Sequence, residues 1–268
     1  GVLSNIIFAY LVKLFAKLPS SLSRRDPRRA SRSNAVMLIL WPLANVAWFI
    51  IIVVLNKSIL FLIPVPISFI TVSFLFYMQI NQFWKMGIRG VDHTIGKGIS
   101  YANALKLCTN GLKFLGLGAS KLTREEEFTN ALNRCTNGEP IKFLLLDPQD
   151  ERLKNAAQMF NRPPEEYKKN VIKSLQKIAE LKRDRAFNIE VRFYKKEPVF
   201  RLMFIDSSLC LFSYYELGKG EGSQLPQLHI VKANENKPHV ESIYYPLEKY
   251  FNELWKESEQ WNFQKYIT

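Results

Sequence analysis

Two uncharged, apolar runs near the N-terminus constrain this chain more than any other feature. Residues 34–55 read NAVMLILWPLANVAWFIIIVVL, and residues 59–80 read ILFLIPVPISFITVSFLFYMQI. Each run has about the 20 residues that a helix needs to cross ~30 Å of hydrocarbon. Both are apolar all round, which argues against a hairpin buried in a soluble core. Because only residues 56–58 separate the runs, we expect a two-helix transmembrane hairpin over residues 34–83.

Basic residues are concentrated around these runs. The formal net charge is +13, and residues 1–83 hold eight Lys or Arg residues against one acid. Five arginines precede the first run: Arg24, Arg25, Arg28, Arg29 and Arg32. The turn between the runs carries a single basic residue, Lys57. The positive-inside rule therefore predicts a multi-pass protein of the inner (cytoplasmic) membrane with both termini in the cytoplasm. Charge in this position indicates anionic lipids as partners rather than direct binding of nucleic acid.

The first 18 residues predict a third membrane element. Apolar side chains recur there at helical spacing: Leu3, Ile6, Ile7, Tyr10, Leu11, Leu14, Phe15 and Leu18. Because Lys13 and Lys17 lie off this stripe, we expect an amphipathic helix in the cytoplasmic interface, followed by the basic segment that completes residues 1–33. A cleaved signal peptide is the alternative, but the segment has no basic n-region and no small-residue cleavage site.

Polar side chains within the predicted spans leave two interpretations open. These residues are Asn45, Ser68, Thr71 and Ser73. In a plain anchor they are tolerated, together with the prolines that bend the helices. In the other interpretation they bond to a neighbouring hairpin, because polar groups between helices favour association in lipid. The second interpretation predicts a homo-oligomer.

Beyond the hairpin, residues 84–110 are expected to form a neck and residues 111–268 a cytoplasmic α/β domain. Apolar runs indicate strands over residues 112–117, 141–146, 189–194, 200–205 and 209–215. Asp206-Ser207-Ser208 predicts a tight hairpin between the last two. Helices are expected after a capping box from Thr123 to Glu126, over residues 167–181 and from Pro246 onward. Strands that alternate with helices imply a sheet between helical layers.

Cysteine, histidine and glycine patterns indicate no metal and no cofactor. Cys108, Cys135 and Cys210 show no zinc-ligand spacing and no disulfide framework, so we expect reduced, buried thiols. His93, His229 and His239 have no partners at the spacing of a metal site or a catalytic triad. Gly116-Leu117-Gly118 matches neither phosphate-loop motif, which leaves tight-turn glycines or an anion cradle as its interpretations.

The order of the predicted elements, together with one motif, resembles half of a phospholipase D superfamily domain. That family's signature is His-x-Lys followed by four residues and Asp; the His is the nucleophile toward a phosphodiester, and the Lys holds its phosphate. Counting back from Asp206 places Arg201 at the Lys position and Val199 at the His position. The family's later Gly-Ser appears as Phe212-Ser213. The resemblance covers residues 113–215 and implies a phospholipase D-like sandwich without hydrolase activity, because valine cannot attack phosphorus.

The resemblance also implies where a phosphate would bind. Arg201 would hold it, together with Asp206, Ser213 and Arg192. The alternative for Arg201 is a surface charge paired with a neighbouring acid.

Three functions are consistent with this pattern. The first is a membrane-anchored effector or sensor, whose degenerate domain binds a nucleotide-type ligand or a protein partner and whose hairpin clusters to disrupt the membrane. This architecture resembles transmembrane effectors of bacterial antiphage defence systems. The second is a passive adaptor that localises a partner protein. The third is a membrane-tethered phosphodiesterase, which requires a nucleophile that the motif lacks.

Overall fold

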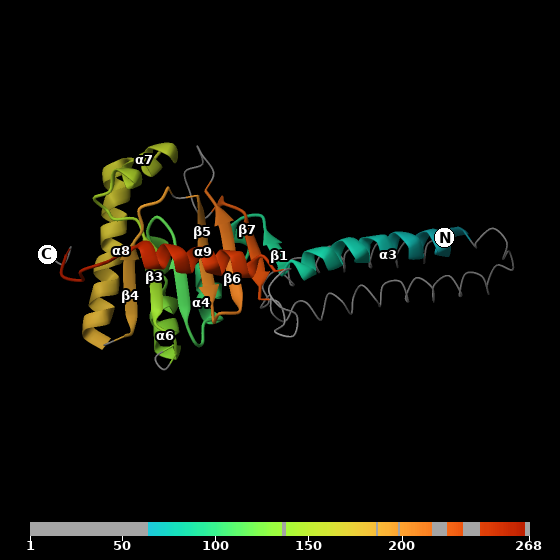
Figure 1. The fold of residues 1–268 in the computed structure, drawn as a ribbon, viewed down its shortest axis with the longest axis horizontal. Coiled ribbons are helices and arrows are strands. Elements are labelled where there is room, and N and C mark those ends of the chain that lie inside the picture. The colour runs from blue at the N-terminus through green and yellow to red at the C-terminus, as the bar shows by residue number, and fades with distance from the viewer. Residues whose placement is uncertain are drawn as a thin grey trace, which may run out of the picture.

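A single mixed sheet organises the part of the chain that the computed structural model describes, which comprises residues 64–135, 138–185, 187–197, 199–215, 224–232 and 242–265. Within these residues the sheet has eight strands in the order β1-β7-β6-β5-β2-β3-β4-β8 (Figure 1). The strands are β1 (Ile88–Asp92), β2 (Leu112–Leu115), β3 (Ile141–Leu145), β4 (Ile189–Phe193), β5 (Phe200–Ile205), β6 (Leu209–Tyr214), β7 (Gln227–Val231) and β8 (Glu259–Gln260).

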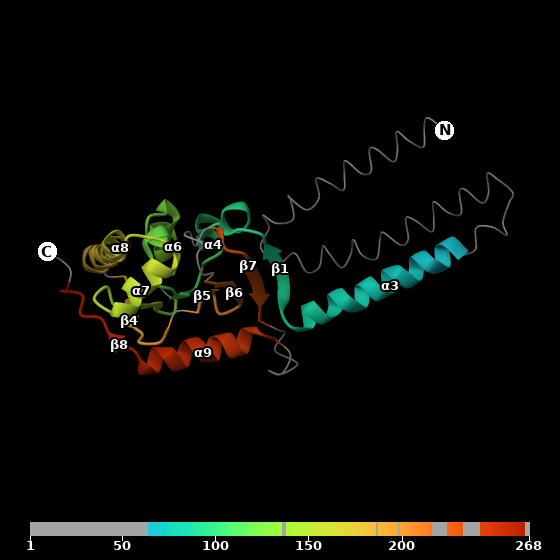
Figure 2. The same cartoon turned by 90° about the horizontal axis from the view of Figure 1, so that it is seen from above.

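Helices cover both faces of this sheet. The helices that the structure describes are α3 (Pro64–Lys85), which does not cover the sheet, the 3-10 turn η1 (Ile95–Lys97), α4 (Tyr101–Lys106), α5 (Ser120–Thr123), α6 (Glu126–Arg134), α7 (Glu151–Met159), α8 (Pro164–Arg185) and α9 (Tyr244–Glu257). Figure 2 shows α9 on one face and α4, α6 and α8 on the other. On the α9 face, Phe204 meets the rings of Tyr244 and Phe251. On the opposite face, Phe128 of α6 packs edge-on against Phe143 of β3. The predicted α/β fold, with a sheet between helical layers, is confirmed.

Strand direction follows from how the strands are connected. β2, β3 and β4 run parallel, and helices connect them, because a parallel crossover needs a long connection. β5 and β6 form the predicted hairpin, in which Ile205 faces Leu209. Asp206 and Ser207 in its turn have φ angles of +52° and +51°, a left-handed conformation in which Asp is enriched. Almost every residue of β3 and β5 is buried, as expected for strands covered on both faces.

Residues 88–110 of the predicted neck belong to the sheet domain instead, whereas residues 84 and 85 end α3. β1 pairs antiparallel with β7, and α4 packs beside α6. The domain therefore begins at β1 rather than near residue 111. The capping box is also wrong: the Thr123 hydroxyl donates to the carbonyl of Ala119, and α6 begins at Glu126. Neither β1 nor β7 was expected, because both carry polar residues at positions that the fold buries.

Helix α3 leads away from the sheet (Figures 1 and 2). Gly87, with a φ angle of +83°, makes the turn from α3 into β1. Large apolar side chains of α3 are 42–58% exposed: Ile70, Phe74, Phe76, Tyr77, Met78 and Phe83. No helix within the described residues is both long enough and apolar enough to cross a membrane. The predicted amphipathic helix, arginine cluster and first span all lie outside the described residues, as do residues 59–63 of the second span.

Candidate functional site

A pocket of about 100 Å³ lies on the sheet face that α4, α5 and α8 cover. It sits at the carboxyl end of β2 and beside the first residues of β5, which runs antiparallel to β2. Carboxyl ends of parallel strands are a common position for ligand sites in α/β sheets. The lining residues are Tyr101, Phe114, Leu117, Gly118, Ala119, Ser120, Lys121, Leu122, Phe160, Arg162, Tyr167, Asn170, Arg201, Tyr215 and Leu225. Three of these are cations, and none of the described lining residues is acidic. Three cations around one cavity favour an anion as its ligand.

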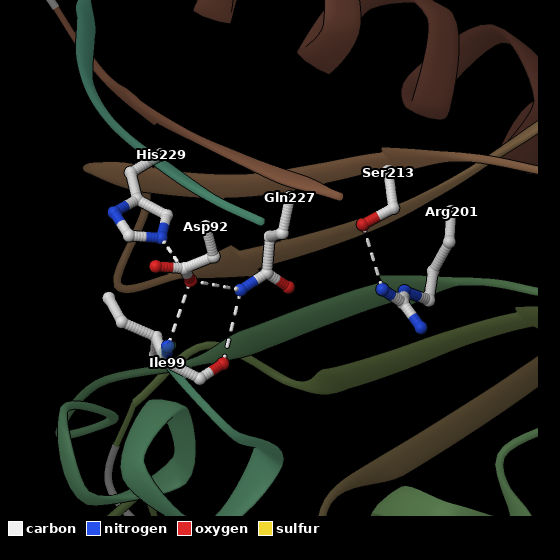
Figure 3. Close-up of polar contacts among 6 residues, drawn as sticks. All are labelled: Asp92, Ile99, Arg201, Ser213, Gln227 and His229. Carbon is white, nitrogen blue, oxygen red and sulfur yellow. Dashed lines mark hydrogen bonds and ion pairs between the residues drawn. The ribbon is translucent and has the colours of Figure 1, made fainter. Parts of the chain in front are cut away.

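Arg201 is the most buried cation of this pocket, with 5% of its surface exposed. Its Nη1 donates to the hydroxyl of Tyr101 over 2.6 Å, and its Nη2 donates to the hydroxyl of Ser213 over 2.8 Å. The guanidinium also lies 5.3 Å from the centre of the Tyr101 ring. Ser213 faces Arg201 across the β5–β6 ladder, and Figure 3 shows the two side chains together. The fold thus holds the Arg201 guanidinium in one orientation beside the cavity.

Tyrosine hydroxyls supply neutral donors to the same pocket. Burial raises the pKa of Tyr215 to about 12, although the charge of Arg201 acts in the opposite direction. Burial also raises the pKa of Tyr167. Both hydroxyls therefore keep their protons at neutral pH. The Tyr215 hydroxyl accepts a hydrogen bond from the amide of Leu117 over 3.2 Å, which leaves its own proton for another acceptor.

Close packing explains the glycines beside the pocket. A Cβ at Gly118 would lie 2.7 Å from a methyl of Val171, and a Cβ at Gly116 would lie 2.8 Å from the ring of Phe114. These distances favour the tight-turn interpretation of Gly116-Leu117-Gly118. The helix that follows, α5, has only four residues.

Of the four residues predicted to hold phosphate, Arg201 and Ser213 lie together. Asp206 lies at the far end of β5 from Arg201. Its carboxylate accepts hydrogen bonds from the amides of Thr109 (2.9 Å), Asn110 (2.7 Å) and Gly111 (3.2 Å) and from the Thr109 hydroxyl (2.8 Å). Burial alone would raise the pKa of Asp206, but these hydrogen bonds hold it below its usual range. Asp206 therefore fixes the loop before β2 and is not part of the pocket.

Arg192 lies on the opposite face of the sheet from the pocket. Its Nη1 donates to the carbonyl of Trp255 in α9 over 2.9 Å, and its guanidinium lies 4.9 Å from the centre of the Trp255 ring. Arg192 thus anchors α9 and cannot reach a ligand beside Arg201. Val199, at the position where the resemblance expects the nucleophile, is 58% exposed.

A buried polar cluster on the pocket's face was missed in the sequence. Nε2 of His229 lies 2.6 Å from Oδ2 of Asp92, and the same oxygen accepts from the Ile99 amide (2.8 Å) and from Nε2 of Gln227 (3.2 Å). Figure 3 shows this cluster beside the Arg201–Ser213 pair. Gly98 makes room for it, because a Cβ there would lie 1.8 Å from Cγ of Asp92. The available signal was the alternation of Gln227 and His229 with apolar residues in one short strand.

No family model matches the sequence, and no curated protein matches it either. Several solved structures share part of the fold, including the following three. TrmBL2, an archaeal chromatin protein with a novel mode of DNA binding, is 15% identical, with a TM-score of 0.39 over 64% of this chain and 54% of its own. Nuc from Salmonella typhimurium, a phospholipase D family member, is 8% identical, with a TM-score of 0.40 over 61% of this chain and 90% of its own. Phosphatidylserine synthase from Haemophilus influenzae Rd KW20 is 9% identical, with a TM-score of 0.41 over 66% of this chain and 40% of its own.

The chain thus spans about half of TrmBL2 and less than half of the phosphatidylserine synthase. A phospholipase D family member is among the structures with a partly similar fold. These similarities concern the arrangement of helices and strands alone.

Proposed function

We propose that this chain is a membrane-anchored effector or sensor whose α/β domain binds a phosphate-bearing anion in the Arg201 pocket. One observation carries the proposal: three cations, Arg201, Lys121 and Arg162, line the same cavity. Guanidinium groups match the geometry of phosphate oxygens, and charge-assisted hydrogen bonds are the stronger ones. Tyr167 and Tyr215 add neutral donors.

The size of the pocket favours a single phosphoryl group. Its volume of about 100 Å³ is several times the ~10–15 Å³ that one water requires. A phosphoryl group fits such a space, whereas the sugar and base of a nucleotide would extend out of it. The ligand would therefore be a phosphate ester that presents one phosphoryl group to Arg201.

Binding without turnover fits the chemistry of the lining better than hydrolysis does. Among the described lining residues there is no histidine and no cysteine. Val199 stands where the resemblance expects the nucleophile, and its side chain cannot form a phospho-enzyme. This argues against the tethered phosphodiesterase.

Anchoring by the hairpin is supported by sequence and by exposure. The two uncharged runs have the length of membrane helices, and the described part of α3 exposes large apolar side chains along its length. We propose that the hairpin lies in the inner membrane with both termini cytoplasmic, and that the basic segment contacts anionic lipids. Ligand binding would cluster the domains into homo-oligomers, and the clustered hairpins would disturb the bilayer, as in the defence effectors that the architecture resembles. A passive adaptor would need neither the anion pocket nor a disturbance of the bilayer.

Inorganic phosphate is the simplest probe of the pocket. Titrated into the full chain in detergent micelles, it should raise the thermal unfolding midpoint. Lys121→Ala and Arg162→Ala should each weaken this binding about tenfold, the effect of losing one charged hydrogen bond. The matched control is Lys195→Ala, an exposed lysine outside the pocket. Equal phosphate binding by the control and by the Lys121→Ala/Arg162→Ala double variant would reject the pocket as the site.

A further inference from the structure

Two of the three cysteines are in contact inside the domain. Sγ of Cys108, just after α4, lies 3.3 Å from Sγ of Cys135, at the end of α6, although 27 positions separate them. Both are free thiols, and they are 0% and 5% exposed. A disulfide bond measures about 2.05 Å, so an approach of about 1.3 Å would join them.

Neighbouring contacts hold the two segments against one another. Nε of Arg134 donates to the carbonyl of Cys108 over 2.9 Å, and its Nη2 donates to the carbonyl of Leu105 over 2.7 Å. Sγ of Cys108 also lies 3.3 Å from the carbonyl oxygen of Gly111, within hydrogen-bond distance. Arg134 precedes Cys135 in the chain, so one side chain ties the end of α6 to the end of α4. These hydrogen bonds hold the two sulfur atoms close together in addition to the contact between the sulfur atoms themselves.

The two thiols differ in exposure and in the direction in which their pKa values shift. The hydrogen bond with Cys108 lowers the pKa of Cys135 against the opposing effect of burial, and the charge of Arg134 acts in the same direction as the hydrogen bond. The same hydrogen bond and burial raise the pKa of Cys108. Cys135 is also the more exposed of the two. Cys135 is therefore the thiol that an oxidant reaches first, and its thiolate is the nucleophile.

We propose that Cys108 and Cys135 form a site of reversible oxidation, which hydrogen peroxide closes into a disulfide. The Cys135 thiolate attacks one peroxide oxygen; an S–O bond forms, the O–O bond breaks, and hydroxide leaves and takes up the proton that Cys135 released. The Cys108 thiol then loses its proton and attacks the sulfur of the Cys135 sulfenic acid. The S–S bond forms, the S–O bond breaks, and the departing hydroxide leaves as water with that proton. Two thiols and one peroxide thus give one disulfide and two waters.

The disulfide would fix a segment that reaches the pocket. Cys108 follows α4, and the first residue of α4, Tyr101, accepts the hydrogen bond from Arg201. Oxidation would therefore tie the helix that covers the pocket to α6. Cys210 offers an internal control, because it lies within β6, opposite Phe204 of β5 and Ile230 of β7.

Counting thiols in the full-length chain tests the proposal. The reduced protein is treated with hydrogen peroxide, denatured and labelled with iodoacetamide, and its intact mass is measured. The number of labelled cysteines should fall from three to one, and dithiothreitol should restore all three. Peptide mapping should show a link between residues 108 and 135. Cys210→Ala should fall from two labels to none, whereas Cys135→Ser should form no intramolecular link.

Results on the unmutated chain test the proposed disulfide even if a variant does not fold. Three labels after peroxide treatment would overturn the proposal. So would a link to Cys210, a link only between two chains, or a sulfinic acid at Cys135 with Cys108 still labelled.

Discussion

The Asp92 carboxylate and the His229 imidazole lie 2.6 Å apart inside the domain, although 137 positions separate them in the chain. Burial would raise the pKa of Asp92, but the nearby His229 and hydrogen bonds from His229, Ile99 and Gln227 hold it below its usual range. The carboxylate is therefore ionised at neutral pH. Asp92 ends β1, the edge strand that follows α3, so this cluster fastens the strand nearest the predicted membrane segment to the rest of the sheet.

Replacing Asp92 tests how much this cluster stabilises the domain. Asp92→Ala leaves His229, Ile99 and Gln227 without their common acceptor. Leaving a buried hydrogen-bond donor without its acceptor costs about 1–3 kcal/mol of unfolding free energy. Urea denaturation of the full chain, followed by tryptophan fluorescence, measures the loss. His93→Ala is the matched control, because His93 is exposed beside the same strand, and it should change stability by less than about 0.5 kcal/mol. A cost for Asp92→Ala as small as the control's would show that the cluster contributes little.

The lowered pKa of Asp92 predicts the direction of a pH dependence. A carboxyl group whose pKa is lower in the folded state stabilises the fold above its unfolded pKa, which is about 3.9. This stabilisation is lost as the pH falls through the folded pKa. Stability measured from pH 7 downward should therefore fall below about pH 4, and it should fall less steeply in Asp92→Asn. An identical loss of stability below pH 4 in the original chain and in Asp92→Asn would contradict the prediction.

Asp206 should matter for stability and not for binding. Asp206→Ala removes the acceptor of three amides and one hydroxyl and places alanine at a φ angle of +52°, at an expected cost of about 2–4 kcal/mol. Asp206→Asn should cost less, because Asn tolerates this conformation and keeps one acceptor. Folded protein of either variant should bind phosphate within about twofold of the original chain, since Asp206 lies at the far end of β5 from Arg201. Phosphate binding is measured by calorimetry. Its loss in the folded Asp206→Asn variant would show that Asp206 belongs to the binding site.

Strands and helices that are buried on a regular pattern could be predicted from the sequence. β2, β3 and β5 are short runs of mostly apolar residues, each with one basic residue (Lys113, Lys142 and Arg201), and a high apolar content is typical of strands covered on both faces. The apolar face of α6 was visible at helical spacing, and Phe128, Ala131 and Leu132 are indeed buried. In contrast, β1 and β7 carry Asp92, Gln227 and His229, whose burial is possible only when the two strands pair. Their pairing depends on register across a long separation, and no local pattern encodes it.

Two of the four residues predicted to hold phosphate, Arg201 and Ser213, lie together, and strand geometry explains why the other two do not join them. Arg201 and Asp206 are five residues apart on an extended strand, which separates their Cα atoms by roughly 16 Å, too far for one phosphate. Arg192 alternates with the buried Ile189, Val191 and Phe193, so its side chain points to the opposite face. The remaining pocket residues, including Arg162, Tyr167 and Lys121, come from segments that only tertiary packing brings together.

The orientation of the hairpin can be tested directly. The five arginines before residue 34 and the single lysine in the turn predict that both ends of the chain are cytoplasmic. Green fluorescent protein fused after residue 20 or at the C-terminus should fluoresce, and alkaline phosphatase at the same sites should be inactive. An active phosphatase at either site would reverse the predicted topology, and release of the chain by alkaline carbonate would reject the anchor itself.

Membrane damage by the clustered hairpins is the prediction that reaches furthest. Each basic residue near an anionic leaflet contributes about 1 kcal/mol of attraction, so the arginine cluster should hold the segment firmly at the surface. Polar side chains that bond between membrane helices contribute only about 0.6 kcal/mol each. Hydrogen bonds between hairpins are therefore too weak to assemble a pore alone, even with all four polar residues, Asn45, Ser68, Thr71 and Ser73. Clustering of the soluble domains must supply the remaining free energy of association. Cells that express the chain with its genomic neighbours, once triggered, should take up a membrane-impermeant dye.

The decisive comparison replaces the membrane segment and keeps the domain. A chain with an unrelated two-helix anchor in place of residues 34–83 should still bind phosphate but should no longer admit the dye. A chain with Asn45→Leu, Ser68→Ala, Thr71→Val and Ser73→Ala keeps the native length and should admit less dye, because its helices lose their interhelical hydrogen bonds. Equal permeability with the native hairpin and with the unrelated anchor would leave the adaptor as the remaining function, since an adaptor needs only that the domain be held at the membrane.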